Sequence, residues 1–181
     1  MKRKEKSMTQ HPEDRIQVLE DREAIRELQA TYCFLVDDGR FDELVEHHFA
    51  EDARCDFRLI GSGLDPIVAE GHEPVRAFFT QGVAALLRDM SHTTHNHRLS
   101  IEGDRASGES YFELTAIDAT TGEAVVGGGR YIDRYRRQAG AWIFEERRAE
   151  IRHMSPLREG WDRQRFLRVL RVLMAAGSTD D

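Results

Sequence analysis

The sequence predicts a single α+β domain in which helices come first and a curved antiparallel sheet follows. Its 181 residues fit one domain of ordinary size. Apolar residues recur at helical spacing through the first half, and four longer segments separated by short spacers follow residue 92. Helices followed by a run of hairpins are typical of the α+β class. A long curved sheet that helices close on one side forms a cone, and its inner cavity is a natural ligand site.

The first half is expected to contain three helices and one strand, after a flexible tail over residues 1–12. The first helix has an apolar stripe at helical spacing, and Gly39 is well placed to cap its end. The stripe consists of Ile16, Leu19, Ile25, Leu28, Tyr32 and Leu35. The expected elements are helices over 14–38, 41–48 and 71–90, a turn over 49–53, a strand over 55–60 and a loop over 61–66.

The second half is expected to form an antiparallel meander, because its spacers are short enough for hairpins. The expected strands cover 93–101, 105–119, 125–137 and 141–153. Residues 13–157 are therefore interpreted as the globular domain. A further helix over 161–176 is expected within a C-terminal segment, residues 158–181, with Phe166, Leu167, Leu170 and Leu173 as its apolar set.

Charge and hydropathy exclude several classes of partner. The net charge is −7, which argues against a general nucleic-acid binder, since that needs a basic face. Eight arginines fall in 141–181, and their mixture with acidic residues favours a salt-bridged surface. No stretch approaches the roughly 20 apolar residues of a membrane span. The basic N-terminus has no apolar run after it, so we expect a cytoplasmic protein without a secretory signal.

The residue inventory also excludes much cofactor chemistry. The only lysines are Lys2, Lys4 and Lys6, so a Schiff base or a pyridoxal phosphate anchor has no lysine in the expected domain. The dinucleotide, phosphate-loop and nucleophile-elbow motifs are missing. Cys33 and Cys55 are too few for a zinc site of cysteines, and both are interpreted as buried apolar groups. A cofactor-free protein that binds a small molecule is the resulting expectation.

One constellation has the residue types for acid–base chemistry. Three histidines, His92, His95 and His97, crowd together, and Asp37 and Asp38 end the first long helix. A carboxylate beside an imidazole is a standard general-base unit, because the carboxylate fixes the tautomer and stabilises the imidazolium. The alternatives are a plain helix cap for the aspartates, and surface residues or a zinc or iron site for the histidines.

Strand periodicity sets a condition on this constellation. Side chains alternate between the two faces of a strand, so His92 lies on the face opposite to Leu99 and Ile101 in a regular strand. His92 therefore reaches the cavity only if it precedes the regular strand or a bulge intervenes.

At this point the sequence resembles the SnoaL-like branch of the nuclear-transport-factor-2-like superfamily. No single motif is specific, but their order and spacing over residues 14–153 are. The matching segments are Tyr32-x4-Asp37, Phe41-Asp42-x-Leu44, Phe49-x-x-Asp52-Ala53, His92-x3-Asn96-His97, Ile101-x-Gly103-Asp104-x-Ala106, Gly129-Arg130-Tyr131-x-Asp133 and Gly140-Ala141-Trp142-Ile143.

The resemblance implies a cone-shaped α+β barrel that is commonly dimeric. The family includes polyketide cyclases, scytalone dehydratase, a hexachlorocyclohexane dehydrochlorinase, ketosteroid isomerases and the structural small subunits of ring-hydroxylating dioxygenases. By resemblance, Asp37 would orient His92, His92 would abstract a proton, and Arg130 would steady a leaving group or oxyanion. The polar lining implied by the resemblance is Tyr32, Asn96 and His97. The neighbouring Asp38 and His95 leave the assignment within each cluster open.

Three functional hypotheses follow. The first is a cofactor-independent lyase or isomerase that acts on a small cyclic or aromatic, partly apolar substrate through His92 and Asp37. The second is a non-catalytic domain that binds an aromatic metabolite. The third is a small accessory subunit of a ring-hydroxylating oxygenase. A homodimer or higher homo-oligomer is expected, with no bound metal and no nucleic-acid or membrane partner.

Overall fold

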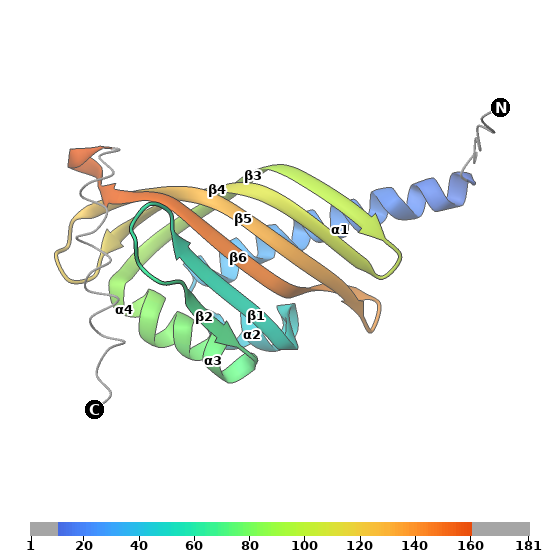
Figure 1. Cartoon of the computed structure of the whole chain (residues 1–181), viewed down its shortest axis with the longest axis horizontal. Coiled ribbons are helices and arrows are strands. Elements are labelled where there is room, and N and C mark those ends of the chain that lie inside the picture. The colour runs from blue at the N-terminus through green and yellow to red at the C-terminus, as the bar shows by residue number, and fades with distance from the viewer. Residues whose placement is uncertain (1–10, 161–181) are drawn as a thin grey trace.

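The computed structural model describes residues 11–160, and the expected helix over 161–176 lies outside them (Figure 1). The helices are α1 (Pro12–Asp37), α2 (Phe41–His48), α3 (His72–Ala77) and α4 (Ala84–Leu86), with a π-helical segment at Phe78–Val83 and a 3₁₀ turn at Leu157–Glu159. The strands are β1 (Phe49–Leu59), β2 (Ile67–Glu70), β3 (Leu87–Glu102), β4 (Arg105–Asp118), β5 (Ala124–Gln138) and β6 (Ala141–Pro156). The predicted α+β class is confirmed.

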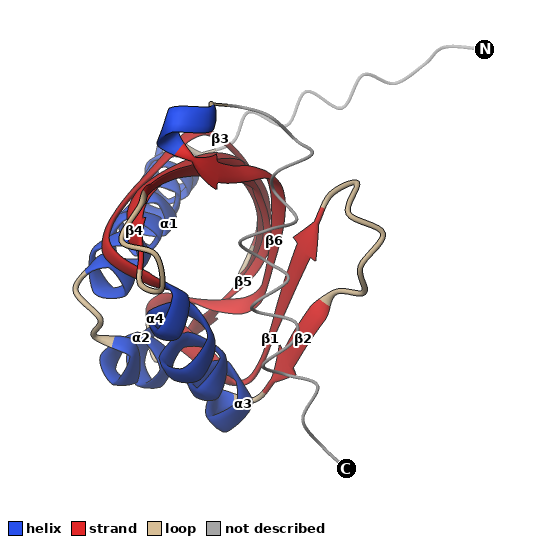
Figure 2. Cartoon of the chain, turned by 90° about the vertical axis from the view of Figure 1, so that its left-hand side faces the viewer, coloured by secondary structure: helices blue, strands red, loops and turns tan. Residues whose placement is uncertain are grey.

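The six strands form one curved sheet in the order β2-β1-β6-β5-β4-β3. Strands β3 to β6 pair as the expected antiparallel meander, and β1 pairs antiparallel with β2 but parallel with β6. Figure 2 shows the sheet curling into an incomplete ring with the helices along its open side. None of the helices in residues 11–160 combines the length and the hydropathy that a membrane span requires.

Helix α1 fills the concave side of the sheet only from its middle onward. Ile25 and Leu28 are buried, whereas Ile16 and Leu19 are 55% and 65% exposed. The first turns of α1 extend beyond the sheet, so the expected apolar stripe has no partner there (Figure 1). At the other end Gly39 has a φ of 69°, as a C-terminal glycine cap requires.

Two predicted elements were wrong in type or extent and one strand was missed, all for reasons of strand pairing. The expected turn over 49–53 is the start of β1, where Phe49 already pairs with β6. Strand β2 was missed, since four residues are too few to show alternation. The expected helix over 71–90 ends at Leu86, because Leu87 is buried and pairs with Asp118 of β4. Pairing with other strands decides all three places, and at Leu87 it overrides a helical pattern.

Gly129 allows β4, β5 and β6 to pack closely behind the cavity. A Cβ atom at this position would overlap the carbonyl oxygen of Glu150 and lie 2.9 Å from Phe112 Cε1. The register of β5 against β6 shifts between Gly128 and Gly129. The run of glycines at 127–129 therefore marks a bulge with close backbone contact.

Gly129→Ala is expected to lower the free energy of unfolding by about 3 kcal/mol, because the backbone of β6 has to move. Urea denaturation measures the change. The matched control is Gly82→Ala, whose Cβ would meet Phe78 at an ordinary 3.8 Å. The control is expected to be neutral or stabilising by about 0.5–1 kcal/mol in this helical segment. Equal stabilities of the two variants would contradict this account of the bulge.

Candidate active site

The carboxylate that ends α1 contacts the imidazole of β3 twice. Asp37 Oδ2 accepts a hydrogen bond of 2.8 Å from the backbone N–H of His92, and Asp37 Oδ1 makes a short hydrogen bond with His92 Nδ1. The two side chains are mostly buried, with exposed fractions of 8% for His92 and 17% for Asp37. Because an ionised carboxylate only accepts, Nδ1 carries the proton of the neutral ring. The other nitrogen, Nε2, then has the lone pair of a general base.

A bulge in β3 satisfies the condition that strand periodicity sets. The register of β3 against β4 shifts between His95 and Arg98, and Asn96 within the shift has a φ of 56°. The extra residue reverses the alternation of side chains. His92 therefore lies on the same inward face as Leu99 and Ile101, and it lines the cavity.

The cavity beside His92 encloses about 100 Å³. Carbon atoms form most of its wall, and the lining residues with polar side-chain atoms are few: His92, Tyr32, Tyr131 and Asp65. The apolar lining comes from both the helices and the sheet. It consists of Val36, Phe57, Leu59, Ile67, Phe78, Phe79, Val83, Leu86, Leu87, Met90, Phe112, Leu114, Ala149, Ile151 and Met154.

The structure separates the neighbouring candidates that the sequence left open. Asp38 is exposed and serves as the C-terminal cap residue of α1, where its backbone N–H donates to Phe34 O at 2.9 Å. His95 stacks on Tyr111, which is itself 40% exposed. Asp37 and His92 are thus the pair that meet.

Of the other predicted site residues, only Tyr32 lines the cavity. Asn96 is exposed at the bulge. His97 is half-buried but does not line the cavity, and burial lowers the pKa of its imidazole below the usual value. The polar lining expected from Asn96 and His97 is therefore wrong for this cavity.

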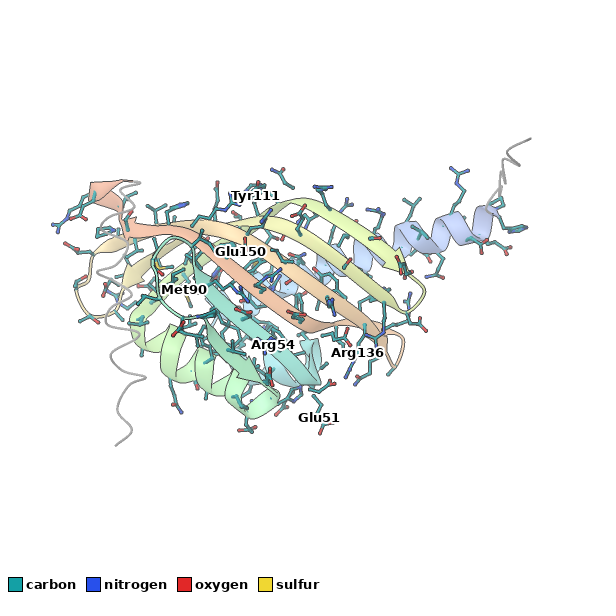
Figure 3. All side chains as sticks on the ribbon, in the orientation of Figure 1. Glu51, Arg54, Met90, Tyr111, Arg136 and Glu150 are labelled. Atoms are coloured by element: carbon teal, nitrogen blue, oxygen red, sulfur yellow. The ribbon has the colours of Figure 1, made fainter. Side chains whose placement is uncertain are left out.

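Arg130 is a second correction, because it lies on the opposite face of β5 from the cavity. Its guanidinium donates to Glu109 at 3.2 Å and to Glu150 at 3.1 Å. Glu150 pairs with Arg130 in the sheet register, and Figure 3 labels it together with Tyr111, the partner of Arg130 on β4. Since adjacent residues of a strand face opposite sides, it is Tyr131 that enters the cavity.

Tyr131 and Asp65 are the polar lining residues that the sequence analysis missed. Val125, Gly127, Gly129, Tyr131, Asp133 and Tyr135 are all buried at every second position of β5. This alternation is a property of the folded strand. The sequence shows no clear period two here, because Val126 and Ile132 are apolar on the opposite face.

The cysteines and the histidine cluster provide no competing site. Burial raises the pKa of the Cys33 thiol to about 11 and that of Cys55 to about 12, so both stay neutral as expected of buried apolar groups. Across residues 11–160, no group of three or more potential ligand side chains is arranged to hold a metal ion. In addition, Nδ1 of His92 is hydrogen-bonded to Asp37, so this nitrogen is not free to bind a metal ion.

Comparison with known proteins agrees with this fold. Residues 17–148 match a sequence family described as SnoaL-like domain. A "putative aromatic ring hydroxylase" from Novosphingobium aromaticivorans has 32% identity and a TM-score of 0.64, over 76% of this chain and 94% of that one. No protein of curated function matches the sequence.

Two more distant solved structures share the fold alone. Hexachlorocyclohexane dehydrochlorinase LinA-type3 from Novosphingobium barchaimii has 20% identity and a TM-score of 0.65, over 78% of this chain and 92% of that one. The beta subunit of a "putative aromatic-ring-hydroxylating dioxygenase" from N. aromaticivorans has 19% identity and a TM-score of 0.62, over 75% and 91%.

Proposed function

The chain belongs to the SnoaL-like domain family, and from this premise we propose that it is a cofactor-independent lyase or isomerase whose general base is His92. The observation that carries the proposal is the contact of His92 Nδ1 with Asp37 beside a mostly apolar cavity that His92 lines. Low-dielectric surroundings strengthen the electrostatics of such a pair. Asp37 stabilises the imidazolium that forms when Nε2 takes a proton.

The proposed reaction starts with abstraction of a proton from a carbon of the substrate. The proton goes to His92 Nε2, and the electron pair of the C–H bond forms a carbon–carbon double bond. In an elimination the leaving group departs with its own electron pair. In an isomerisation the π pair of an adjacent carbonyl moves onto its oxygen. When the imidazolium returns the proton elsewhere on the substrate, that pair re-forms the carbonyl bond.

The cavity favours a substrate with one ring. Its volume of about 100 Å³ is of the order of the ~150 Å³ apolar cavity that holds benzene in an engineered protein. The apolar wall suits a cyclic or aromatic skeleton, and few polar groups remain to orient it.

A homodimer in the cytoplasm stays a prediction, which gel filtration and cell fractionation check.

One alternative has an observation in its favour. The relative of 32% identity is described as an aromatic ring hydroxylase in its provisional name, so an accessory subunit of a ring-hydroxylating oxygenase is the second candidate function. Co-purification with a larger iron protein would support this candidate. In that case Asp37 and His92 are expected to be dispensable for the activity of the assembly.

Solvent deuterium exchange tests the proposed base without knowledge of the full reaction. The protein is incubated in D₂O with a panel of one-ring ketones, halogenated cyclohexanes and hydroxylated cyclohexenones, and NMR follows both exchange and elimination. We expect turnover of at least one compound. Asp37→Asn is expected to lower that rate by about 10²–10⁴-fold, because the tautomer of His92 is no longer held.

The matched control is Asp38→Asn, since Asp38 is the adjacent, exposed carboxylate. It is expected to keep the rate within about twofold, as surface substitutions remote from the reacting groups do. Equal rates in the two variants, or no exchange with any compound of the panel, would count against the proposed function.

A further inference from the structure

A fully buried arginine lies behind the cavity, surrounded by aromatic rings. The guanidinium carbon of Arg147 is 3.9 Å from the ring centre of Tyr131, 4.0 Å from that of Tyr32 and 4.2 Å from that of Phe144. Its side chain has no exposed surface. A cation against the faces of several rings is attracted by their quadrupoles, most strongly where water is excluded.

The arginine is held in place by a buried polar network. Arg147 Nε and Nη2 donate to the two oxygens of Asp133 at 3.1 and 3.0 Å, and Nη2 also donates to Gln29 at 3.3 Å. Tyr135 donates to Asp133 at 2.8 Å and accepts from Gln29 at 2.7 Å. The remaining nitrogen, Nη1, is buried without a hydrogen-bond partner within the described part of the chain. The carboxylate thus lies on one side of the guanidinium only.

Tyr32 and Tyr131 separate this cation from the cavity, because both line it and both rest on Arg147. Their hydroxyl groups lie close enough together for each to affect the pKa of the other. Two hydroxyls carry two protons, and a hydrogen bond between them would use only one. The second proton is available for a ligand, whichever tyrosine donates to the other.

Charge near the rings favours donation of that proton. Burial raises the pKa of both phenols, while the Arg147 cation acts in the opposite direction. Although burial alone disfavours a charged guanidinium, Asp133 raises the pKa of Arg147 above its usual value, so the group stays a cation. A phenol polarised by a nearby cation is a stronger hydrogen-bond donor to an anion.

We propose that Tyr32 and Tyr131 form an oxyanion-binding pair, and that Arg147 is a positioning residue which acts through them. The ligand class is a one-ring compound with an ionised or developing anionic oxygen, such as an enolate or a phenolate. This inference deepens the proposed function and rests on its cavity. When His92 abstracts a proton next to a carbonyl, the electron pair moves to the carbonyl oxygen, which then accepts the tyrosine hydrogen bond. The tyrosine keeps its proton throughout.

Two probes of matched shape test the pair by equilibrium binding. The probes are 4-nitrophenol, used above its own pKa so that it is ionised, and 4-nitrotoluene, in which a methyl group replaces the oxygen. Titration of the wild-type protein is expected to show tighter binding of the phenolate and a shift of its absorption band. A hydrogen bond to a charged group predicts a roughly ten- to hundredfold loss of phenolate affinity in the Tyr32→Phe/Tyr131→Phe double variant, with 4-nitrotoluene affinity unchanged.

Two tyrosines outside the cavity serve as controls. Tyr135→Phe removes a buried hydroxyl of the same network, and Tyr111→Phe removes an exposed one. Both are expected to keep the preference for the phenolate. Equal loss of both probes in the double variant, no preference in the wild type, or no binding of either probe would overturn the proposal.

The role of Arg147 needs a variant that folds, because its loss alone leaves Asp133 buried and unpaired. Arg147→Met/Asp133→Leu removes both charges together. It is expected to keep the affinity for 4-nitrotoluene and to lose about tenfold in phenolate affinity, together with the band shift. An unchanged preference in this variant would refute the positioning role, as would its failure to bind 4-nitrotoluene.

The same measurements separate this inference from the proposed function. Preference for the phenolate that depends on the tyrosines, without deuterium exchange into any compound, would leave the oxyanion pair intact and refute the base. Deuterium exchange that depends on Asp37, without any preference for the phenolate, would support the base and refute the oxyanion pair.

Discussion

His92→Ala is expected to lower the exchange or elimination rate by about 10²–10⁴-fold, the range typical of a positioned general base. The variant removes the only imidazole among the residues that line the described cavity. The rate constant is measured under single-turnover conditions, with the compound that the wild-type protein turns over fastest. Folding is expected to survive, because the backbone N–H of residue 92 still donates to Asp37.

His95→Ala is the matched control, because His95 is three residues away on the same strand and stacks on the exposed Tyr111 instead of lining the cavity. Its rate is expected to stay within about twofold of wild type. A fully active His92→Ala protein, or equal losses in both variants, would refute the assignment of His92 as the base.

Arg147→Met is expected to lower the free energy of unfolding by about 3–5 kcal/mol, because it leaves the Asp133 carboxylate buried and uncompensated. Both side chains have no exposed surface. Such a loss is a large fraction of the stability of a typical domain. Urea denaturation followed by far-ultraviolet circular dichroism measures it.

Two further proteins complete this experiment. Arg147→Met/Asp133→Leu is expected to regain most of the lost stability, since both charges disappear from the interior. Arg148→Met is the matched control, because Arg148 is the next residue and keeps 32% of its side chain exposed. Its Nε lies 3.9 Å from Glu150 Oε1. The control is expected to cost less than about 1 kcal/mol. Equal losses for Arg147→Met and Arg148→Met would contradict the account of the buried ion pair.

The sequence predicted the architecture well where periodicity extends over many residues. The long first helix and the four-strand meander show clear periods, and both are present. The short β2 and the start of β3 could not be predicted, because pairing with distant strands decides them. Leu87 illustrates this, since it continues a helical apolar pattern but pairs with β4.

The candidate site was predicted in part, and the failures have physical causes. The carboxylate and histidine clusters could be identified from their residue types, and the family resemblance selected Asp37 and His92 within them. Arg130 and Tyr131 are adjacent, and which of them enters the cavity depends on a register that a one-residue shift reverses. Arg147 was interpreted as one of many surface arginines of residues 141–181, yet it is completely buried. Composition cannot distinguish it from Arg148.

The protonation of the two His92 nitrogens is the most direct readout of the proposed base, and ¹⁵N NMR of histidine-labelled protein measures it without a substrate. At a pH where the ring is neutral, we predict a proton on Nδ1, held by Asp37, and a bare Nε2 whose resonance moves when 4-nitrotoluene fills the cavity. A proton on Nε2, or an Nε2 resonance that ignores the ligand, would contradict the Asp37–His92 base.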